Sequence, residues 1–293
     1  MQVHLRPLHW AAGVIAWLLL AQPAVHAQSM LDGYWNLLLD EDAPEYGAGP
    51  EEGDYAGLPV TAASRDVAQS WDPEQLTVPE MQCQPFPSTY GPRAVTIMRV
   101  WEDRDPYNNQ QTQIETWIAF SAQHRHIYMT PQPEPPPVTP DSWQGYSTGR
   151  WVGNVLWVHT DRLKAAFIAR NGLPLDDRST MDERFFRYAD VLTDVMMISD
   201  PQYLTRPVIE SKEYWRAPDG IMEPYPCVPN DETPRPKGVL PMHLPGVVVH
   251  DGPLAYGMPL QAAQGGAETM FPEYEDVMQS LPPNPAPKAG HKR

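Results

Sequence analysis

GRWVGNVLWVHT, residues 149–160, is the stretch that most clearly indicates a β fold. Valine- and tryptophan-rich runs lie on both sides of the dipeptide Gly153-Asn154. Glycine and asparagine tolerate the left-handed backbone that a two-residue hairpin turn requires. The stretch therefore predicts a pair of antiparallel strands joined at this turn.

Further β-rich runs follow one another on both sides of this hairpin, between residues 93 and 217. In one of them Ile114, Thr116 and Ile118 occupy alternate positions, as they would on one face of a strand. About eight such runs without intervening helices predict a mainly β protein, an antiparallel meander closed as a barrel or folded as a sandwich. The expected architecture is lipocalin-like, and a barrel of that size can enclose one small ligand.

Proline-rich segments flank the predicted β core. Proline makes up 35 of 293 residues and aromatic residues 10%, which favours extended loops around a folded core rather than disorder. Thr61 is placed to cap a short helix, and further short helices are expected at 258–264 and 267–280. The predicted organisation is a signal peptide at 1–27, an N-terminal arm with a short helix at 28–92, the antiparallel core at 93–217, a proline-rich C-terminal wrap with short helices at 218–281, and a disordered tail at 282–293.

The first 27 residues are typical of a cleavable signal peptide. Arg6 provides the positive start, and the apolar run at 10–20 is about a dozen residues long, too short for the roughly 20 that span a bilayer. Small residues before Ala27 predict cleavage after it, with Gln28 as the new N-terminus. The chain is therefore expected to be periplasmic or secreted and not an integral membrane protein.

Cysteine usage and net charge fit this location. Cys83 and Cys227 are the two cysteines of the chain, and such a pair in an exported protein predicts one disulfide; two independent buried thiols are the alternative. In the loop-entropy model this long-range link would stabilise the fold by about 4–5 kcal/mol. The formal net charge of −16 at pH 7 disfavours nucleic acid as a partner. No cofactor motif is recognised.

His124 and His126 are the sharpest local signal for chemistry. Two residues apart on a strand, they share one face, and Tyr128 continues the row. With His159 on the following hairpin, they are weak candidates for a Zn or Cu site. The alternative is that both histidines are ordinary surface residues of a sheet.

Two further sets of residues are candidates for function. An acid–base site at the barrel rim, in a hydrolase or lyase, would use His124, His126, Tyr128, Arg150 and Asp161, with Tyr146 nearby. An apolar ligand pocket would be lined by aromatic and methionine side chains, which otherwise would be plain core. These pocket candidates are Trp117, Tyr146, Trp151, Trp157 and Phe186, together with Phe167, Met196 and Met197.

The run at 143–160, WQGYSTGRWVGNVLWVHT, also resembles the signature of a family of exported, uncharacterised bacterial β-rich proteins. In that family a Gly-Arg-Trp hairpin turn leads into a valine-rich strand. The stretches at 124–129, 171–185 and 265–274 resemble the same family. Its members commonly carry an Asp-Gly-Arg-x-His-Pro turn after the histidine strand, and here Thr130 and the prolines after it replace that turn. The resemblance implies export and a β fold but no established activity.

Three functions are compatible with these signals. The favoured one is binding of a small apolar or amphipathic ligand in the barrel cavity. The alternatives are a periplasmic acid–base enzyme and an envelope interaction module that presents the proline-rich arms.

Overall fold

The computed structural model describes most of the chain from Leu31 onward. The described residues are 31–38, 52–71, 82–93, 97–129, 138–169, 171–229, 237–238, 244–245, 253, 257–282 and 284. The predicted signal peptide with its cleavage site, the proline-dense segment at 130–137 and nearly all of the predicted tail lie outside the described residues.

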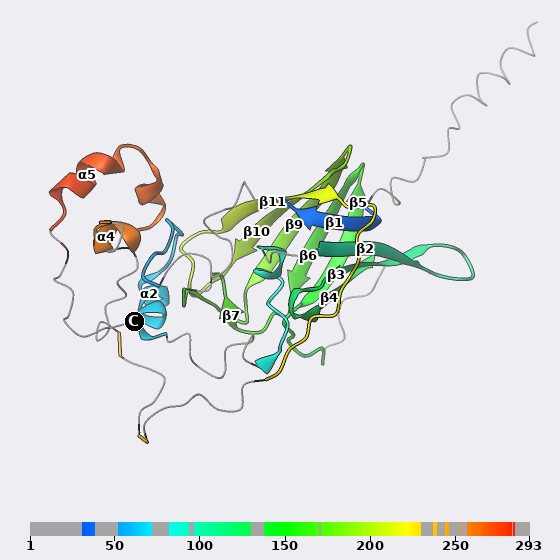
Figure 1. The fold of residues 1–293 in the computed structure, drawn as a ribbon, viewed down its shortest axis with the longest axis horizontal. Coiled ribbons are helices and arrows are strands. Elements are labelled where there is room, and N and C mark those ends of the chain that lie inside the picture. Colours follow the sequence, from blue (N-terminus) through cyan, green and yellow to red (C-terminus); the bar gives the residue numbers. More distant parts are fainter. Residues whose placement is uncertain are drawn as a thin grey trace, which may run out of the picture. The chain divides into compact units, whose positions relative to one another are not determined.

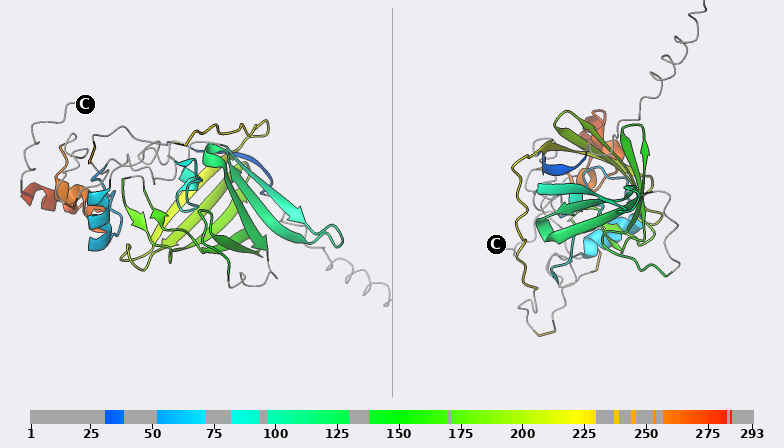
Figure 2. Two further views of the ribbon diagram at one scale, coloured as in Figure 1. Left: turned by 90° about the horizontal axis from the view of Figure 1, so that it is seen from below. Right: turned by 90° about the vertical axis from the view of Figure 1, so that its right-hand side faces the viewer.

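Nine strands close into a barrel in the order β1-β11-β10-β9-β6-β5-β4-β3-β2, which confirms the predicted mainly β fold (Figures 1 and 2). The strands are β1 (Gly33–Leu37), β2 (Ile97–Arg104), β3 (Gln111–Ile118), β4 (Gln123–Met129), β5 (Tyr146–Val152), β6 (Val155–Asp161), β9 (Thr180–Tyr188), β10 (Val191–Ser199) and β11 (Val208–Arg216). Closure removes the exposed sheet edges at which unpaired backbone groups would otherwise have to be protected.

One neighbouring pair of strands, β4 and β5, runs parallel, whereas the sequence predicted an antiparallel meander. The cause is the odd strand number, because strands that alternate in direction around a ring of nine cannot close without one parallel pair. Ile127 lies opposite Ser147 and Tyr128 opposite Thr148 in this pair. Strand β5 therefore begins level with the middle of β4 and runs in the same direction.

The hairpin at Gly153-Asn154 has the predicted form. Val152 pairs with Val155, and Gly153 has a φ of +61°, the left-handed backbone for which glycine is suited. The predicted arm also contributes to the barrel, because β1 pairs with both β2 and β11 and closes the ring. Trp35 of β1 is fully buried and donates from its indole nitrogen to the carbonyl of Leu31 at 2.9 Å.

The β-rich run at 163–169 lies outside the barrel. It contributes β7 (Ala166–Phe167), which pairs with β8 (Pro174–Leu175) in a separate two-stranded sheet. Helix α2 (Ala62–Ser70) contacts β8, and Ala68 of this helix belongs to the same buried cluster as Leu175. The hairpin and the helix thereby bury apolar side chains that the barrel strands β9 and β10 offer at this end, among them Met181 and Met196.

A side-chain cap explains where helix α2 begins. The Thr61 hydroxyl accepts a hydrogen bond from the Ser64 amide at 3.2 Å, as the sequence predicted for α2. Near the C-terminus, α4 (Leu260–Ala263), the 3₁₀ helix η6 (Ala267–Met270) and α5 (Tyr274–Ser280) match the helices expected there. None of the helices in the described ranges is both long and apolar enough to cross a membrane.

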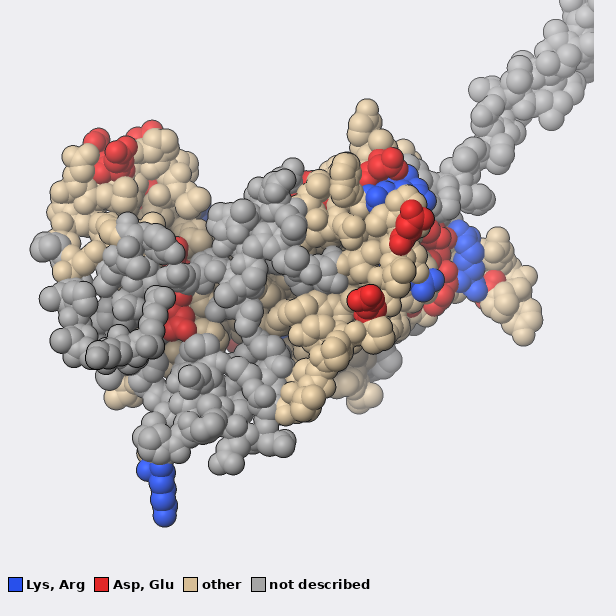
Figure 3. All heavy atoms as spheres, viewed as in Figure 1, with Lys and Arg blue, Asp and Glu red and all other residues tan. Residues whose placement is uncertain are grey.

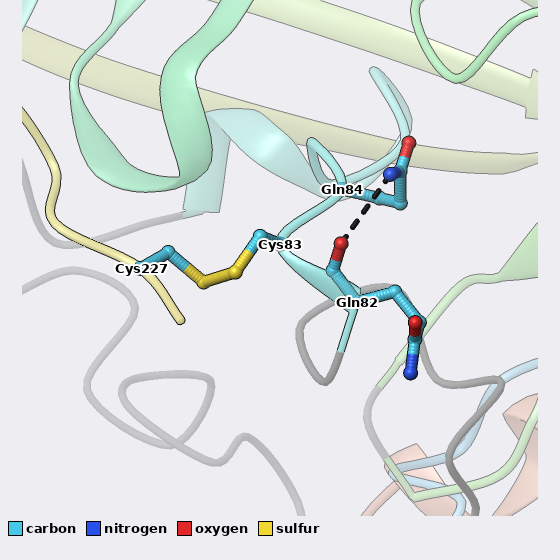
Figure 4. Close-up of a disulfide and its surroundings, with 4 residues drawn as sticks. All are labelled: Gln82, Cys83, Gln84 and Cys227. Atoms are coloured by element: carbon cyan, nitrogen blue, oxygen red, sulfur yellow. Dashed lines mark hydrogen bonds between the residues drawn. A yellow bond between two sulfur atoms is a disulfide. The ribbon is translucent and has the colours of Figure 1, made fainter. Parts of the chain in front are cut away.

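The two cysteines form the predicted disulfide. Cys83 and Cys227 are linked with their Cα atoms 5.7 Å apart, within the range that a disulfide spans (Figure 4). The link joins positions 144 residues apart in the sequence, so it ties the segment before β2 to the segment after β11.

Candidate functional site

Four charged side chains point into the barrel in phase with apolar neighbours. Arg125 lies on β4, Glu183 on β9, Asp194 on β10 and Lys212 on β11, and each is at most 5% exposed. The set contains two cations and two anions, so it is charge-balanced when all four groups are ionised. Buried charges are costly unless they are paired in this way.

Arg125 is held by three neighbours around the barrel wall. Its guanidinium donates to both carboxylate oxygens of Glu183, one of them at 2.8 Å, and forms a bidentate pair. It also donates to the hydroxyls of Ser147 at 2.9 Å and Thr160 at 2.6 Å. Although burial acts to lower the pKa of Arg125, the charge and hydrogen bonds of Glu183 raise it overall, so the guanidinium stays charged.

Asp194, unlike Arg125, has no hydrogen-bond partner among the described residues. It faces Lys212 across the β10–β11 ladder, yet no hydrogen-bond donor among the described residues reaches either of its two buried carboxylate oxygens. Burial, followed by the negative charge of Glu183, raises the pKa of Asp194 well above its ordinary value. The raised pKa widens the pH range over which this carboxyl is protonated, and in that form it can both donate and accept a hydrogen bond.

A hollow of about 20 Å³ lies beside Asp194 inside the barrel. Its walls include both polar and apolar side chains; they comprise Ser88, Pro92, Met98, Thr116, Ile118, Gln123, Arg125, Gln144, Glu183, Phe185, Asp194 and Tyr214. The enclosed part has room for one or two water molecules or for a polar group of that size.

The histidines of β4 lie on the outer face of the barrel wall. Because side chains alternate along a strand, His124, His126 and Tyr128 point outward while Arg125 and Ile127 are buried inside. This confirms that the two histidines share one face and that Ile127 lies on the other. The side chains of His124 and His126 are 35% and 47% exposed.

Glu115 of β3 meets both histidines on this outer face. One of its carboxylate oxygens lies 2.9 Å from His124 Nε2 and 2.8 Å from His126 Nδ1. Although it faces outward, Glu115 is only 2% exposed, because the imidazole rings and neighbouring indoles cover it. Among those indoles, Trp101 and Trp117 have ring centroids 5.5 Å and 5.1 Å from that of His124.

The remaining acid–base candidates spread along the same outer face. Tyr128 stacks on Tyr146 with the ring centroids 4.9 Å apart, and Tyr146 pairs in register with Asp161. Burial, then the charges of Tyr128 and Asp161, raise the pKa of Tyr146. The structure thus brings His126, Tyr128, Tyr146 and Asp161 to neighbouring strands.

Arg150 and His159 belong to a second hollow of about 220 Å³ on the outer surface. There Arg150 and Arg184 lie over the Trp157 ring, at 5.3 Å and 3.9 Å from its centroid. His159 Nδ1 is 3.0 Å from Asp182 Oδ1. His159 is therefore engaged with Asp182 on β9 rather than with the histidine pair on β4.

The aromatic residues expected to line a cavity lie mostly outside the barrel. Trp117 and Phe186 are each 37% exposed, and Tyr146 and Trp157 also point outward. Trp151 points inward and donates to Gln111 at 2.8 Å. Of the others, Met196 is buried in the cluster near α2, Met197 is half-buried on β10, and Phe167 packs against Phe86 and Tyr90.

The residues that line the interior hollow were not among the sequence candidates, although a signal was present. Arg125 lies in phase with Ile127 and Met129, Glu183 with Met181 and Phe185, and Asp194 with Leu192 and Met196. A charged residue at the apolar phase of a strand indicates a buried charge, and these three strands carry one each, as does β11 with Lys212. On β4 the histidines, which are the stronger chemical signal in the sequence, lie on the opposite phase from Arg125.

The exposed charges are unevenly distributed. On the face shown in Figure 3, acidic side chains gather over α5, whereas over the barrel acidic and basic side chains lie side by side.

Comparisons of the chain with protein-family models, with curated proteins and with solved structures found no match. Function is therefore inferred from the geometry of the described residues.

Proposed function

We propose that this chain is an exported β-barrel protein that binds a small amphipathic ligand, with the ligand's polar group inside the barrel against Asp194. The observation that carries the proposal is the buried carboxyl of Asp194, whose two oxygens face a hollow and receive no hydrogen bond from the described residues. A buried polar group without a partner costs about 1–3 kcal/mol, and a bound ligand or an ordered water removes this cost.

The chemistry of the walls limits the ligand class. Met98, Ile118 and Phe185 offer an apolar surface, while Asp194 and the Arg125–Glu183 pair supply the polar side. A wholly apolar ligand would leave Asp194 unsatisfied. A ligand with an alkyl part and one small neutral head group, such as a hydroxyl or an amide, satisfies both sides. The head group is expected to be neutral because a buried charge is costly and the raised pKa of Asp194 reflects the same cost for its own carboxylate.

The acid–base interpretation has less support. Its residues, His124, His126, Tyr128, Arg150 and Asp161, lie along the outer wall of the barrel and do not border the interior hollow. The proposed export depends on the signal peptide predicted from the sequence and is consistent with the disulfide. Membership of the exported β-rich family stays a prediction.

The proposal is tested by ligand-observed saturation-transfer NMR with primary alcohols from ethanol to 1-hexanol at millimolar concentration. Transfer is expected to be strongest at the methylene next to the hydroxyl, because that group enters the hollow. Ile118→Trp fills the hollow and should abolish the transfer. Trp117→Phe, the neighbouring residue on the outer face of β3, is the matched control and should leave it unchanged. Equal transfer to both variants, or none to the wild type, would contradict the proposal.

A further inference from the structure

A second site on the barrel is separate from the interior hollow. On the outer face of β3 and β4, Glu115 is the register partner of His126, and Trp117 is that of His124. The antiparallel ladder therefore sets one carboxylate beside a pair of imidazoles that project from alternate positions of the adjacent strand. The ligand-type atoms of Glu115, His124 and His126 all lie within 4.8 Å of one another.

The two histidines contact Glu115 differently: His126 Nδ1 forms a hydrogen bond with Glu115 Oε1 at 2.9 Å, whereas His124 Nε2 forms none. His124 Nε2 lies 2.9 Å from Glu115 Oε2, yet both atoms are buried and neither makes a hydrogen bond in the described structure. Their mutual distance suits a hydrogen bond, but their orientation does not. Two buried polar atoms without a hydrogen bond carry an energetic cost that a bound ion would remove.

The geometry points to a site for a divalent transition-metal ion, coordinated by Glu115, His124 and His126. Imidazole and carboxylate are ligands that Zn²⁺ and its neighbours in the first transition series accept, at about 2.0–2.2 Å from the metal. In tetrahedral coordination at that radius the ligand atoms lie about 3.3–3.4 Å apart, so an ion would require the N···O contacts of 2.8 and 2.9 Å to open by about 0.5 Å. Three protein ligands leave a coordination position for water or another molecule.

The surroundings hold this set in place and leave it accessible. Trp101 and Trp117 lie against the His124 ring, and the centroids of His124 and His126 are 4.4 Å apart. Because Glu115 is only 2% exposed, its carboxylate is largely desolvated and attracts a cation more strongly than an exposed one would. His126 is 47% exposed on its side chain, so an ion can reach the cluster from solvent.

Zn²⁺ titration of the untagged full chain, stripped with EDTA and followed by calorimetry, tests this site. The wild type is expected to bind one ion here, and His126→Asn and Glu115→Gln to weaken that binding at least about 100-fold, since loss of an outer-shell partner alone costs about 10–100-fold. His124→Phe retains the ring contacts with the tryptophans and should weaken binding to the same degree. His159→Asn, on the same outer face but paired with Asp182, is the matched control.

Co²⁺ gives a second readout, because its visible absorption reports coordination in any variant that circular dichroism shows to be folded. The wild type is expected to give a Co²⁺ spectrum typical of coordination by nitrogen and oxygen ligands. Folded His126→Asn and His124→Phe should not give this spectrum. Equal Zn²⁺ affinity in the wild type and these variants would overturn the proposal. So would a loss of affinity in His159→Asn as large as that in His126→Asn.

Discussion

Both faces of strand β4 place polar groups in the barrel wall, but the two faces differ in how fully those groups are hydrogen-bonded. Inward, Arg125 makes hydrogen bonds to Glu183, Ser147 and Thr160 and is fixed on several sides. Outward, His124 and His126 converge on Glu115 and leave atoms without hydrogen bonds. Because side chains alternate along a strand, the hydrogen-bonded network of Arg125 and the cluster of Glu115 with the two histidines lie on opposite faces of the barrel wall. The atoms without hydrogen bonds in that cluster are among those proposed to coordinate an ion.

Adjacent acidic residues of β9 give the sharpest test of this difference. Glu183→Ala removes the partner of the buried Arg125 and is expected to lower the free energy of unfolding by about 3–5 kcal/mol. Asp182→Ala removes the partner of the exposed His159, and exposed pairs contribute about 0–1 kcal/mol. Urea unfolding of both variants measures the contrast. Losses of similar size would show that the interior pair is not structural.

A matched pair on β4 compares packing on the two faces. Ile127 is fully buried, so Ile127→Ala should destabilise the fold by about 2–5 kcal/mol through lost burial and the cavity that remains. Tyr128→Ala removes an outward ring that stacks on Tyr146, and such pairs contribute about 0.5–1.5 kcal/mol. Thermal and chemical unfolding should give the same order. A larger loss from Tyr128→Ala would place the main packing outside the barrel.

How far these features could be predicted from the sequence depended on how local they are. Gly153-Asn154 and Thr61 act within a few residues, so the hairpin and the helix cap could be predicted from turn and capping chemistry. The parallel β4–β5 pair depends on closure of the whole ring of strands. A short sequence pattern cannot predict it, because such a pattern reports only on neighbouring residues. Glu115 could not be assigned to the histidine cluster because that assignment requires the β3–β4 register. Arg125 could have been recognised, since it breaks an otherwise apolar phase.

The pH dependence of stability should differ between the interior and the surface through Asp194. Its pKa is raised in the folded state, so the folded protein binds a proton that the unfolded chain releases above about pH 4. The wild type should therefore lose free energy of unfolding as pH rises, by up to about 1.4 kcal/mol per pH unit from this group, until its folded pKa is passed. Asp194→Asn should remove this slope and be the more stable protein at pH 7. An unchanged slope in urea unfolding between pH 4 and 7 would contradict the assignment.

A smaller effect of the same sign is expected at Asp32, just before β1. Burial, then the charge of Glu102, raises the pKa of Asp32 to about 6, while Arg104 and Arg99 oppose the shift. Stability should fall as pH rises from about 4 to about 6, and Asp32→Asn should flatten that window. Because Asp32 is partly exposed, solvent screening is expected to keep the contribution below about 1 kcal/mol. Asp32→Asn and Asp194→Asn should add, since they act at separate sites.

Native mass spectrometry of the protein isolated from its own host directly tests whether a ligand binds inside the barrel. If the interior hollow holds the head group of an amphipathic ligand, the wild type should carry a non-covalent adduct that dissociates on collisional activation. The adduct should be absent from Ile118→Trp, in which the hollow is filled, and should persist in Trp117→Phe. A wild-type spectrum with the bare chain mass alone, or an adduct that persists in Ile118→Trp, would contradict binding inside the barrel.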